Sequence, residues 1–157
     1  MSLVLYQHPF AVYCWKALIA FYERDVPFTA ALVEADRSAL AALWAPASIP
    51  ILVDDSVVVC ESSIIVDHLD RHGDAPPLIP TDRDEALQAR LWDRVADGYL
   101  TTPVQTIVGD ALRPPDAKDP HGVSQAHATL DLAYATLDRQ LNRHDHDGWL
   151  AGDDFTL

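Results

Sequence analysis

The sequence predicts a two-part protein in which a mixed α/β part is followed by an all-α part. Short apolar runs alternate with helical spacing over the first part. A proline-rich stretch, G-D-A-P-P-L-I-P-T-D at 73–82, then has the composition of a connector between domains. Beyond it, apolar residues recur at helical spacing in two long segments, which is typical of packed helices. We therefore divide the chain into 1–73, a linker at 74–82, and 83–157.

The beginning of the α/β part predicts the order strand, helix, strand, helix. Residues 3–6 and 28–33 are apolar runs of strand length, bounded by proline and polar residues. Between them, residues 12–24 carry an apolar face at helical spacing. That face consists of Cys14, Leu18 and Phe21. Residues 38–44 predict a second, shorter helix.

The stretch 47–63, A-S-I-P-I-L-V-D-D-S-V-V-V-C-E-S-S, predicts two further strands around an acidic turn. Pro50 lies inside its first apolar run, although proline lacks an N–H and belongs at a strand start or on an edge. It indicates a special backbone shape, of which a cis peptide bond is one. A helix follows whose apolar face is predicted to be Ser62, Ile65, Val66 and Leu69. The four predicted strands form a mixed sheet.

The all-α part predicts two long antiparallel helices. Leu87, Leu91 and Val95 recur every four residues in a helix over about 84–112, which R-P-P at 113–115 ends. The second helix has the face Leu130, Ala133, Leu137 and Leu141. The final G-D-D-F-T-L has the pattern of a helix start, so we expect the helical part to be incomplete at its C-terminus.

Composition argues against several classes of function. The formal charge of −13, from 24 acidic and 11 basic residues, argues against nucleic-acid binding. Apolar runs fall short of the roughly 20 residues of a membrane span, and we expect no signal peptide. The two cysteines, Cys14 and Cys60, are consistent with a reducing compartment, so we expect a cytoplasmic protein. The H-D-H-D cluster at 144–147 is interpreted as a solvated loop, and no metal is expected.

Taken in this order, the segments resemble the glutathione transferase family over essentially the whole chain. The most specific motifs are I-P-I-L at 49–52, E-S-S-I-I at 61–65 and the final G-D-D-F-T-L. The resemblance implies a thioredoxin-like N-terminal domain and a helical C-terminal domain. It also implies an enzyme that joins the thiol of glutathione, its co-substrate, to a small hydrophobic electrophile, and a homodimer.

The resemblance places glutathione binding on Ile49, Pro50, Glu61 and Ser62. The backbone N–H and C=O of Ile49 would bond the cysteinyl part of glutathione, as an added strand does. Ser62 and the first amides of its helix would hold the γ-glutamyl carboxylate. Glu61 would orient that turn or pair with the amino group of the ligand. The competing interpretation of Glu61 and Ser62 is a simple helix cap.

The activating residue of the family, a Ser, Cys or Tyr that favours the thiolate of glutathione, falls on Ala11 in this chain. Alanine has no donor. Three neighbours are candidates for compensation: Tyr6 at the end of the first strand, His8, and Cys14 at the second position of a C-x-x-C-like A-V-Y-C. Each also has a structural interpretation, as a strand aromatic, a loop residue and a buried thiol.

Three functions therefore remain open from the sequence. The first is conjugation, with Trp92, Tyr99 and Pro103 as walls for the electrophile, although aromatic residues at helical spacing are often core. Asp97 would reach the glutathione of a neighbouring subunit in a dimer. The second is a non-catalytic glutathione-binding or interaction protein, because Ala11 lacks the activating group. The third is thiol–disulfide exchange through Cys14.

Overall fold

The computed structural model describes residues 2–34, 37–143, 149–152 and 154–157. The chain divides into two compact units, Met1–Ile79 with Leu157, and Pro80–Thr156. Within the described residues, none of the helices combines the length and apolar character that crossing a membrane requires. The histidine cluster at 144–147 lies outside the described residues.

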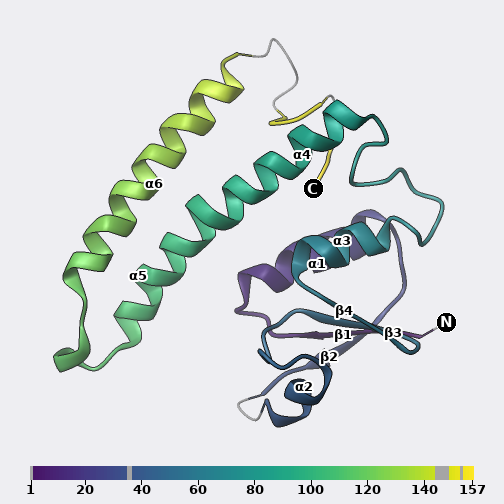
Figure 1. Cartoon of the computed structure of the whole chain (residues 1–157), viewed down its shortest axis with the longest axis horizontal. Helices are drawn as coiled ribbons and strands as arrows, with labels where there is room; N and C mark the ends of the chain where they lie inside the picture. Colours follow the sequence, from purple (N-terminus) through teal and green to yellow (C-terminus); the bar gives the residue numbers. More distant parts are fainter. Residues whose placement is uncertain (1, 35–36, 144–148, 153) are drawn as a thin grey trace. The chain divides into compact units, whose positions relative to one another are not determined.

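The first unit is a four-stranded sheet with helices on both faces (Figure 1). Its elements are β1 (Leu3–Gln7), α1 (Val12–Glu23), β2 (Thr29–Leu32), α2 (Ser38–Leu43), β3 (Ile51–Asp54), β4 (Val57–Cys60) and α3 (Ser62–Leu69). The strand order is β2-β1-β3-β4, with β1 parallel to β2 and the other neighbours antiparallel. Helices α1 and α3 pack together on one face, and α2 lies on the other. This confirms the predicted thioredoxin-like fold.

Alternation along the strands divides the apolar side chains of this unit between two clusters. Leu5 and Leu52 belong to the larger cluster, under α1 and α3, together with the fully buried Phe21. Ile51 belongs to the smaller cluster on the α2 side, against which Tyr6 packs. Successive residues of a strand point to opposite faces, which explains this division. The predicted face of α3 is confirmed, since its buried residues are Ser62, Ile65, Val66 and Leu69.

The segment after α3 is held to the first unit by a buried charge pair. Arg24 ends α1 and is 3% exposed. Its guanidinium lies beside the Asp70 carboxylate and donates to carbonyl oxygens of the segment, including that of His72 at 2.7 Å. The Asp70 carboxylate accepts the N–H groups of Leu78 and Ile79, both at 2.9 Å. These bonds explain why the first unit extends to Ile79, beyond the boundary that composition alone predicts.

The second unit is helical. Its elements are α4 (Arg83–Val95), the π-helical segment η1 (Ala96–Thr101), α5 (Thr102–Leu112), the short 3₁₀ segment η2 (Pro115–Ala117) and α6 (Pro120–Leu141). Helix α6 packs against α5. The predicted helix over 84–112 therefore contains a π segment. Pro103 has no N–H to donate to the helix, and the Thr102 hydroxyl bonds the carbonyl of Asp97 at 3.0 Å, which accounts for the altered winding.

The leucine repeat that predicted this helix does not mark the buried side of α4. Leu87 and Leu91 are 62% and 48% exposed, whereas the buried residues of α4 are Ala86, Ala89 and Asp93. The leucines share one side of the helix, and that side is exposed. The buried side is the one that carries the small alanine residues. The face predicted for α6 is confirmed in part: Leu130 and Ala133 are buried, together with Ala126, whereas Leu137 is half-buried and Leu141 is exposed.

Candidate functional site

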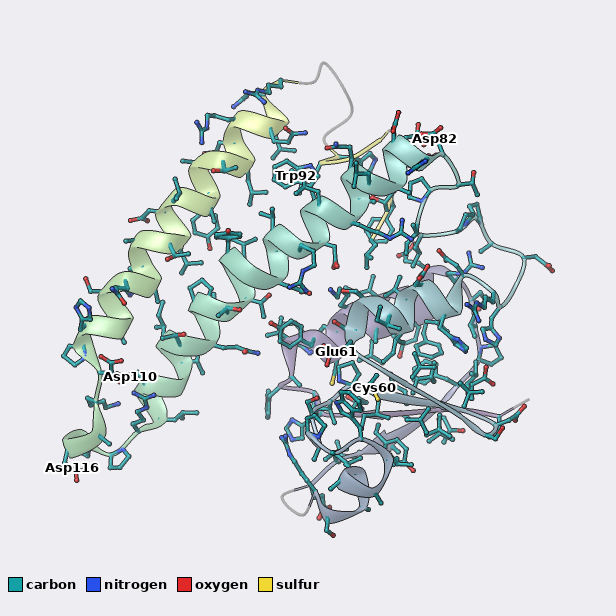
Figure 2. All side chains as sticks on the ribbon, viewed as in Figure 1. Cys60, Glu61, Asp82, Trp92, Asp110 and Asp116 are labelled. Carbon is teal, nitrogen blue, oxygen red and sulfur yellow. The ribbon has the colours of Figure 1, made fainter. Side chains whose placement is uncertain are left out.

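The stretch 47–63 forms the β3–β4 hairpin, and its first and last residues meet at one end of the sheet in the first unit. Ile51, the first residue of β3, is paired with Tyr6 of β1 on one side and Cys60 of β4 on the other. Figure 2 shows Cys60 and Glu61 at the turn where β4 ends and α3 begins. This end of the sheet, made of residues 49–51 and 60–62, is called the β3–α3 edge below.

The Ile49–Pro50 peptide bond is cis. Pro50 is buried, whereas Ile49 is half-buried and packs against the smaller apolar cluster. Ile49 precedes β3, and within the described part of the chain its backbone N–H and C=O have no hydrogen-bond partner. The β3–α3 edge therefore offers one donor and one acceptor of an extended backbone.

Glu61 and Ser62 form the start of α3. Glu61 has φ of 69°, a left-handed conformation that is rare for a non-glycine residue and costs about 1–3 kcal/mol. Its side chain is exposed, and its carbonyl accepts the Ile65 N–H at 2.9 Å. Ser62 is the first residue of α3 and is only 5% exposed. The first amides of a helix lack intrahelical acceptors, so donors converge at this point.

A neighbouring contact was not predicted from the sequence. The Lys16 ammonium of α1 donates to the hydroxyl of Ser63 at 2.9 Å, next to Ser62. It brings a positive charge toward the N-terminal end of α3, where anions are already favoured by the helix dipole. The two residues lie far apart in the sequence, and no spacing rule links them.

The start of α1 presents backbone rather than side-chain donors. Ala11 is the N-cap residue, with φ −95° and ψ 109°, and it makes no side-chain cap bond. Its N–H bonds the His8 carbonyl at 3.0 Å, and its own carbonyl accepts the Cys14 N–H at 2.9 Å. The amides of Val12 and Tyr13 therefore begin the helix without acceptors inside it.

Tyr6 and His8 occupy the last part of β1 and the loop after it. Tyr6 is half-buried and packs against the apolar cluster on the α2 side, together with Ile49 and Cys60. His8 accepts the Phe10 N–H on Nδ1 at 3.2 Å. A neutral imidazole that accepts on Nδ1 carries its proton on Nε2, so the Nε2 of His8 is a donor.

Cys14 is fully buried, and burial raises the pKa of its thiol above the ordinary value, against smaller opposing effects of the His8 backbone and the Arg37 charge. Partial burial and then the Glu61 charge raise the pKa of the half-buried Cys60 thiol as well. Both environments disfavour the thiolate, which is the reactive form. Neither cysteine has the electropositive, accessible surroundings of a nucleophilic thiol.

The other predicted residues lie in the second unit, on α4 and the helical segment after it. Trp92 is half-buried, and among the residues that the structure describes its indole N–H has no partner. Asp97 and the exposed Tyr99 lie in η1, where Arg94 pairs with Asp97 at 3.8 Å. Pro103 is buried in the first turn of α5. The π segment thus separates Trp92 from Pro103.

A thioredoxin-like unit with this edge, followed by a helical unit, defines a class of proteins that the comparisons also identify. Residues 5–77 match the family model described as glutathione S-transferase, N-terminal domain. Glutathione transferase GST 23 of maize (Zea mays) is 36% identical over 89 residues, which are 54% of this chain and 38% of the maize protein. The aligned part thus spans well under half of that relative. These matches support membership of the glutathione transferase family, and the match to its N-terminal domain lies in the first unit of the chain.

Solved structures show the same fold. A glutathione S-transferase from Methylobacillus flagellatus KT, with glutathione bound, has a TM-score of 0.89 at 23% identity and covers 99% of this chain and 76% of its own. One from Methylobacterium radiotolerans, in complex with glutathione sulfonate, has a TM-score of 0.84 at 25% identity, covering 99% and 73%. Ure2p in complex with glutathione has a TM-score of 0.87 at 18% identity, covering 99% and 78%.

Proposed function

We propose that the β3–α3 edge binds glutathione and that the protein joins the glutathione thiol to a small hydrophobic electrophile. Ser62 carries this proposal. This residue is only 5% exposed and is the first of α3, where the amides of the opening turn have no acceptors inside the helix. A carboxylate ligand at this point would accept hydrogen bonds from the hydroxyl and from these amides, and bonds to a charged group contribute about 1.5–3 kcal/mol each. The glutathione bound in structural relatives supports the same assignment.

The γ-glutamyl end of glutathione would occupy the start of α3. Its carboxylate would accept bonds from the Ser62 hydroxyl and the first amides of the helix, with the helix dipole adding attraction. The exposed carboxylate of Glu61 would pair with the ligand's amino group. The left-handed backbone of Glu61 supports this role, because such strain concentrates at binding sites.

The cysteinyl part of glutathione would pair with Ile49 in the manner of an added strand. The free N–H and C=O of Ile49 supply the two bonds that such pairing needs. Pro50, which follows directly, has no N–H of its own. The ligand would then run from Ile49 to Ser62, with its thiol directed toward the start of α1.

The thiol of glutathione must lose its proton before its sulfur bonds the electrophilic carbon and a leaving group such as chloride departs. Donors at the start of α1 would favour the thiolate, as they do for protein thiols at helix N-termini. Ala11 contributes no side-chain donor, which leaves the Val12 amide and the helix dipole. His8 through Nε2 and Tyr6 through its hydroxyl are the side-chain candidates for the remaining bond.

Ala11 also favours a second function, namely a glutathione-binding protein without transferase activity. Loss of one donor to an anion typically lowers a rate by about 100-fold or more. Among the structural relatives, Ure2p in complex with glutathione is also described as the nitrogen regulation fragment of a yeast prion protein. Thiol–disulfide exchange through Cys14 has less support, because that thiol is fully buried and its pKa is raised.

The electrophile would contact the second unit in this proposal. Trp92, Tyr99 and Pro103 are the candidate walls, and the carboxylate of Asp97 is the candidate contact to a partner's glutathione in a homodimer. Cytoplasmic location belongs to the same proposal, because glutathione is the reductant of that compartment and both cysteines are free.

Two measurements on the same protein test the proposal. Titration calorimetry with glutathione measures binding, and the absorbance change of an aryl halide with glutathione measures conjugation. We expect saturable binding together with conversion above the uncatalysed rate. Binding without conversion would favour the second function, and the absence of both would contradict the whole assignment.

A further inference from the structure

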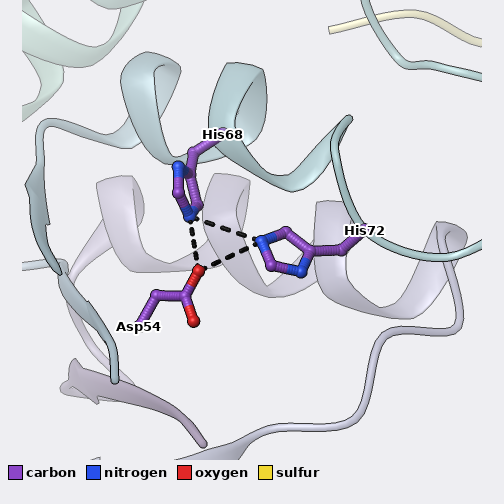
Figure 3. Close-up of side chains that lie close together, drawn as sticks. All are labelled: Asp54, His68 and His72. Atoms are coloured by element: carbon purple, nitrogen blue, oxygen red, sulfur yellow. Dashed lines mark hydrogen bonds and ion pairs between the residues drawn. The ribbon is translucent and has the colours of Figure 1, made fainter. Parts of the chain in front are cut away.

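The C-terminal ends of β3 and α3, which lie away from the β3–α3 edge, bring together the side chains of Asp54, His68 and His72 (Figure 3). Asp54 is the last residue of β3 and pairs with Leu3, so it lies at the end of the strand away from Ile51 and the β3–α3 edge. His68 lies in the last turn of α3, and His72 follows four residues later. The cluster is therefore separate from Ser62, with about 9 Å of helix rise between positions 62 and 68.

The three potential ligand atoms form a compact triangle. Nε2 of His68 lies 2.9 Å from Oδ2 of Asp54, and Nε2 of His72 lies 3.2 Å from the same oxygen. The two Nε2 atoms are 3.4 Å apart. In four-coordinate zinc, bonds of about 2.0–2.2 Å place neighbouring ligand atoms roughly 3.3–3.5 Å apart. The observed separations lie within a few tenths of an ångström of that arrangement.

We infer that Asp54, His68 and His72 form a three-ligand binding site for a divalent transition-metal ion, with Zn²⁺ the best match. Imidazole nitrogens with one carboxylate suit zinc, whereas Ca²⁺ and Mg²⁺ prefer oxygen ligands throughout. The side chains of Asp54, His68 and His72 are 12%, 13% and 8% exposed, so water can reach the fourth position. No part of this inference depends on glutathione binding.

The backbone at His72 is held by contacts to two other residues. The His72 N–H bonds the Leu69 carbonyl at 2.9 Å, and its carbonyl accepts the buried Arg24 guanidinium at 2.7 Å. Gly73 follows with φ of +72°, and a Cβ there would approach the Arg24 carbonyl oxygen to 3.3 Å. These contacts fix the backbone from which the His72 side chain projects.

A cluster held only by hydrogen bonds is the competing arrangement. Both imidazoles would then donate an Nε2 proton to the same Asp54 oxygen, and the contact would be a polar link between β3 and α3. Zinc binding requires both Nε2 atoms without protons. The two arrangements therefore differ in whether the protein takes up one metal equivalent with measurable affinity.

The ion would join the end of β3 to the end of α3 and to the segment that follows. It would stabilise the first unit by binding the folded state alone, and at a concentration of 100 times its Kd it would raise the Tm by several degrees. It would leave the Ser62 end of α3 unchanged. We therefore expect the same glutathione affinity with and without zinc.

Competition with a chromophoric zinc chelator tests the site. Chelator-treated protein should take up one Zn²⁺ per chain, and the conservative changes Asp54→Asn, His68→Gln and His72→Gln should each weaken binding at least about 100-fold. His127→Gln, at an exposed position of α6, is the matched control and should bind as the unsubstituted protein does. A second control changes both His144 and His146 to glutamine and should also retain the site.

Anomalous scattering from a crystal of the unsubstituted protein grown with ZnCl₂ provides a readout that does not depend on folding of variants. The inference predicts a peak about 2.0–2.2 Å from Oδ2 of Asp54 and from both Nε2 atoms. Absence of stoichiometric binding, or binding lost only when His144 and His146 are changed, would overturn it. A peak elsewhere, with none at the triangle, would overturn it as well.

Discussion

Nε of Arg24 lies 3.5 Å from Oδ1 of Asp70, and this pair joins the C-terminal ends of α1 and α3. The Arg24 side chain is 2% exposed and that of Asp70 13%. Arg24 also holds backbone carbonyls of the segment after α3, and Asp70 holds the amides of Leu78 and Ile79. One buried pair thus orders the segment that closes the first unit.

Arg24→Met should strongly destabilise the protein. The change removes the buried guanidinium and leaves the Asp70 carboxylate without compensation, a situation that costs about 3–5 kcal/mol. Urea unfolding followed by circular dichroism measures the loss. Arg113→Met is the control, because Arg113 is half exposed and its pair with Asp110 at 3.7 Å is worth about 0–1 kcal/mol. Equal losses in the two variants would contradict the importance given to the buried pair.

Ser62→Ala should weaken glutathione binding about 5- to 30-fold. The change removes a charge-assisted hydrogen bond, which contributes about 1–2 kcal/mol. Calorimetric titration of both proteins gives the ratio. Ser56→Ala is the matched control, because Ser56 is exposed in the turn at the other end of the β3–β4 hairpin. An unaltered affinity in Ser62→Ala would remove this residue from the site.

Ala11→Ser should raise the rate of conjugation about 10- to 100-fold, because it restores a side-chain donor to the thiolate at the start of α1. The aryl halide assay at saturating glutathione measures it. Ala128→Ser, at an exposed position on α6, controls for the added hydroxyl. No increase would show that the activating position lies elsewhere, with Tyr6 and His8 the next positions to change.

Cys60 should react with Ellman's reagent before Cys14, because Cys60 is half-buried and Cys14 is fully buried. The variant Cys60→Ser should therefore lose the faster phase, and Cys14→Ser should keep it. A fast phase that disappears in Cys14→Ser would contradict the burial of that thiol and would revive exchange chemistry.

Because the pKa values of both thiols are raised, we expect their contribution to the free energy of unfolding to decrease at alkaline pH. The folded protein holds these protons more tightly than the unfolded chain does. Their contribution to stability is fully present below the unfolded pKa and is lost as the pH rises through the folded pKa. Urea midpoints measured at increasing alkaline pH should fall less in the double variant Cys14→Ser, Cys60→Ser than in the unsubstituted protein. An equal or larger fall would contradict this linkage.

The order of elements and the buried face of α3 could be predicted from sequence because both follow from local patterns. Alternation and helical spacing depend on neighbouring residues, so Ile65, Val66 and Leu69 were placed correctly. The buried side of helix α4 could not be predicted in this way. It carries the small residues Ala86 and Ala89, and a pattern of large apolar residues does not reveal a side that is lined by alanine.

The contacts that hold the segment after α3 could not be predicted in the same way. Arg24 and Asp70 are 46 positions apart in the numbering, and no periodic pattern relates them. The spacing of His68 and His72 is a usable signal, because two histidines separated by three to five residues recur as zinc ligands. Asp54 could join them only once the hairpin and α3 were placed in three dimensions.

A crystal structure of the protein with glutathione tests binding at the β3–α3 edge. We expect the γ-glutamyl carboxylate within about 2.7–3.2 Å of the Ser62 hydroxyl and the cysteinyl backbone paired with Ile49. We also expect the glutathione sulfur near the amide of Val12. Glutathione bound away from the β3–α3 edge, or an edge that stays free of ligand at saturating glutathione, would contradict it.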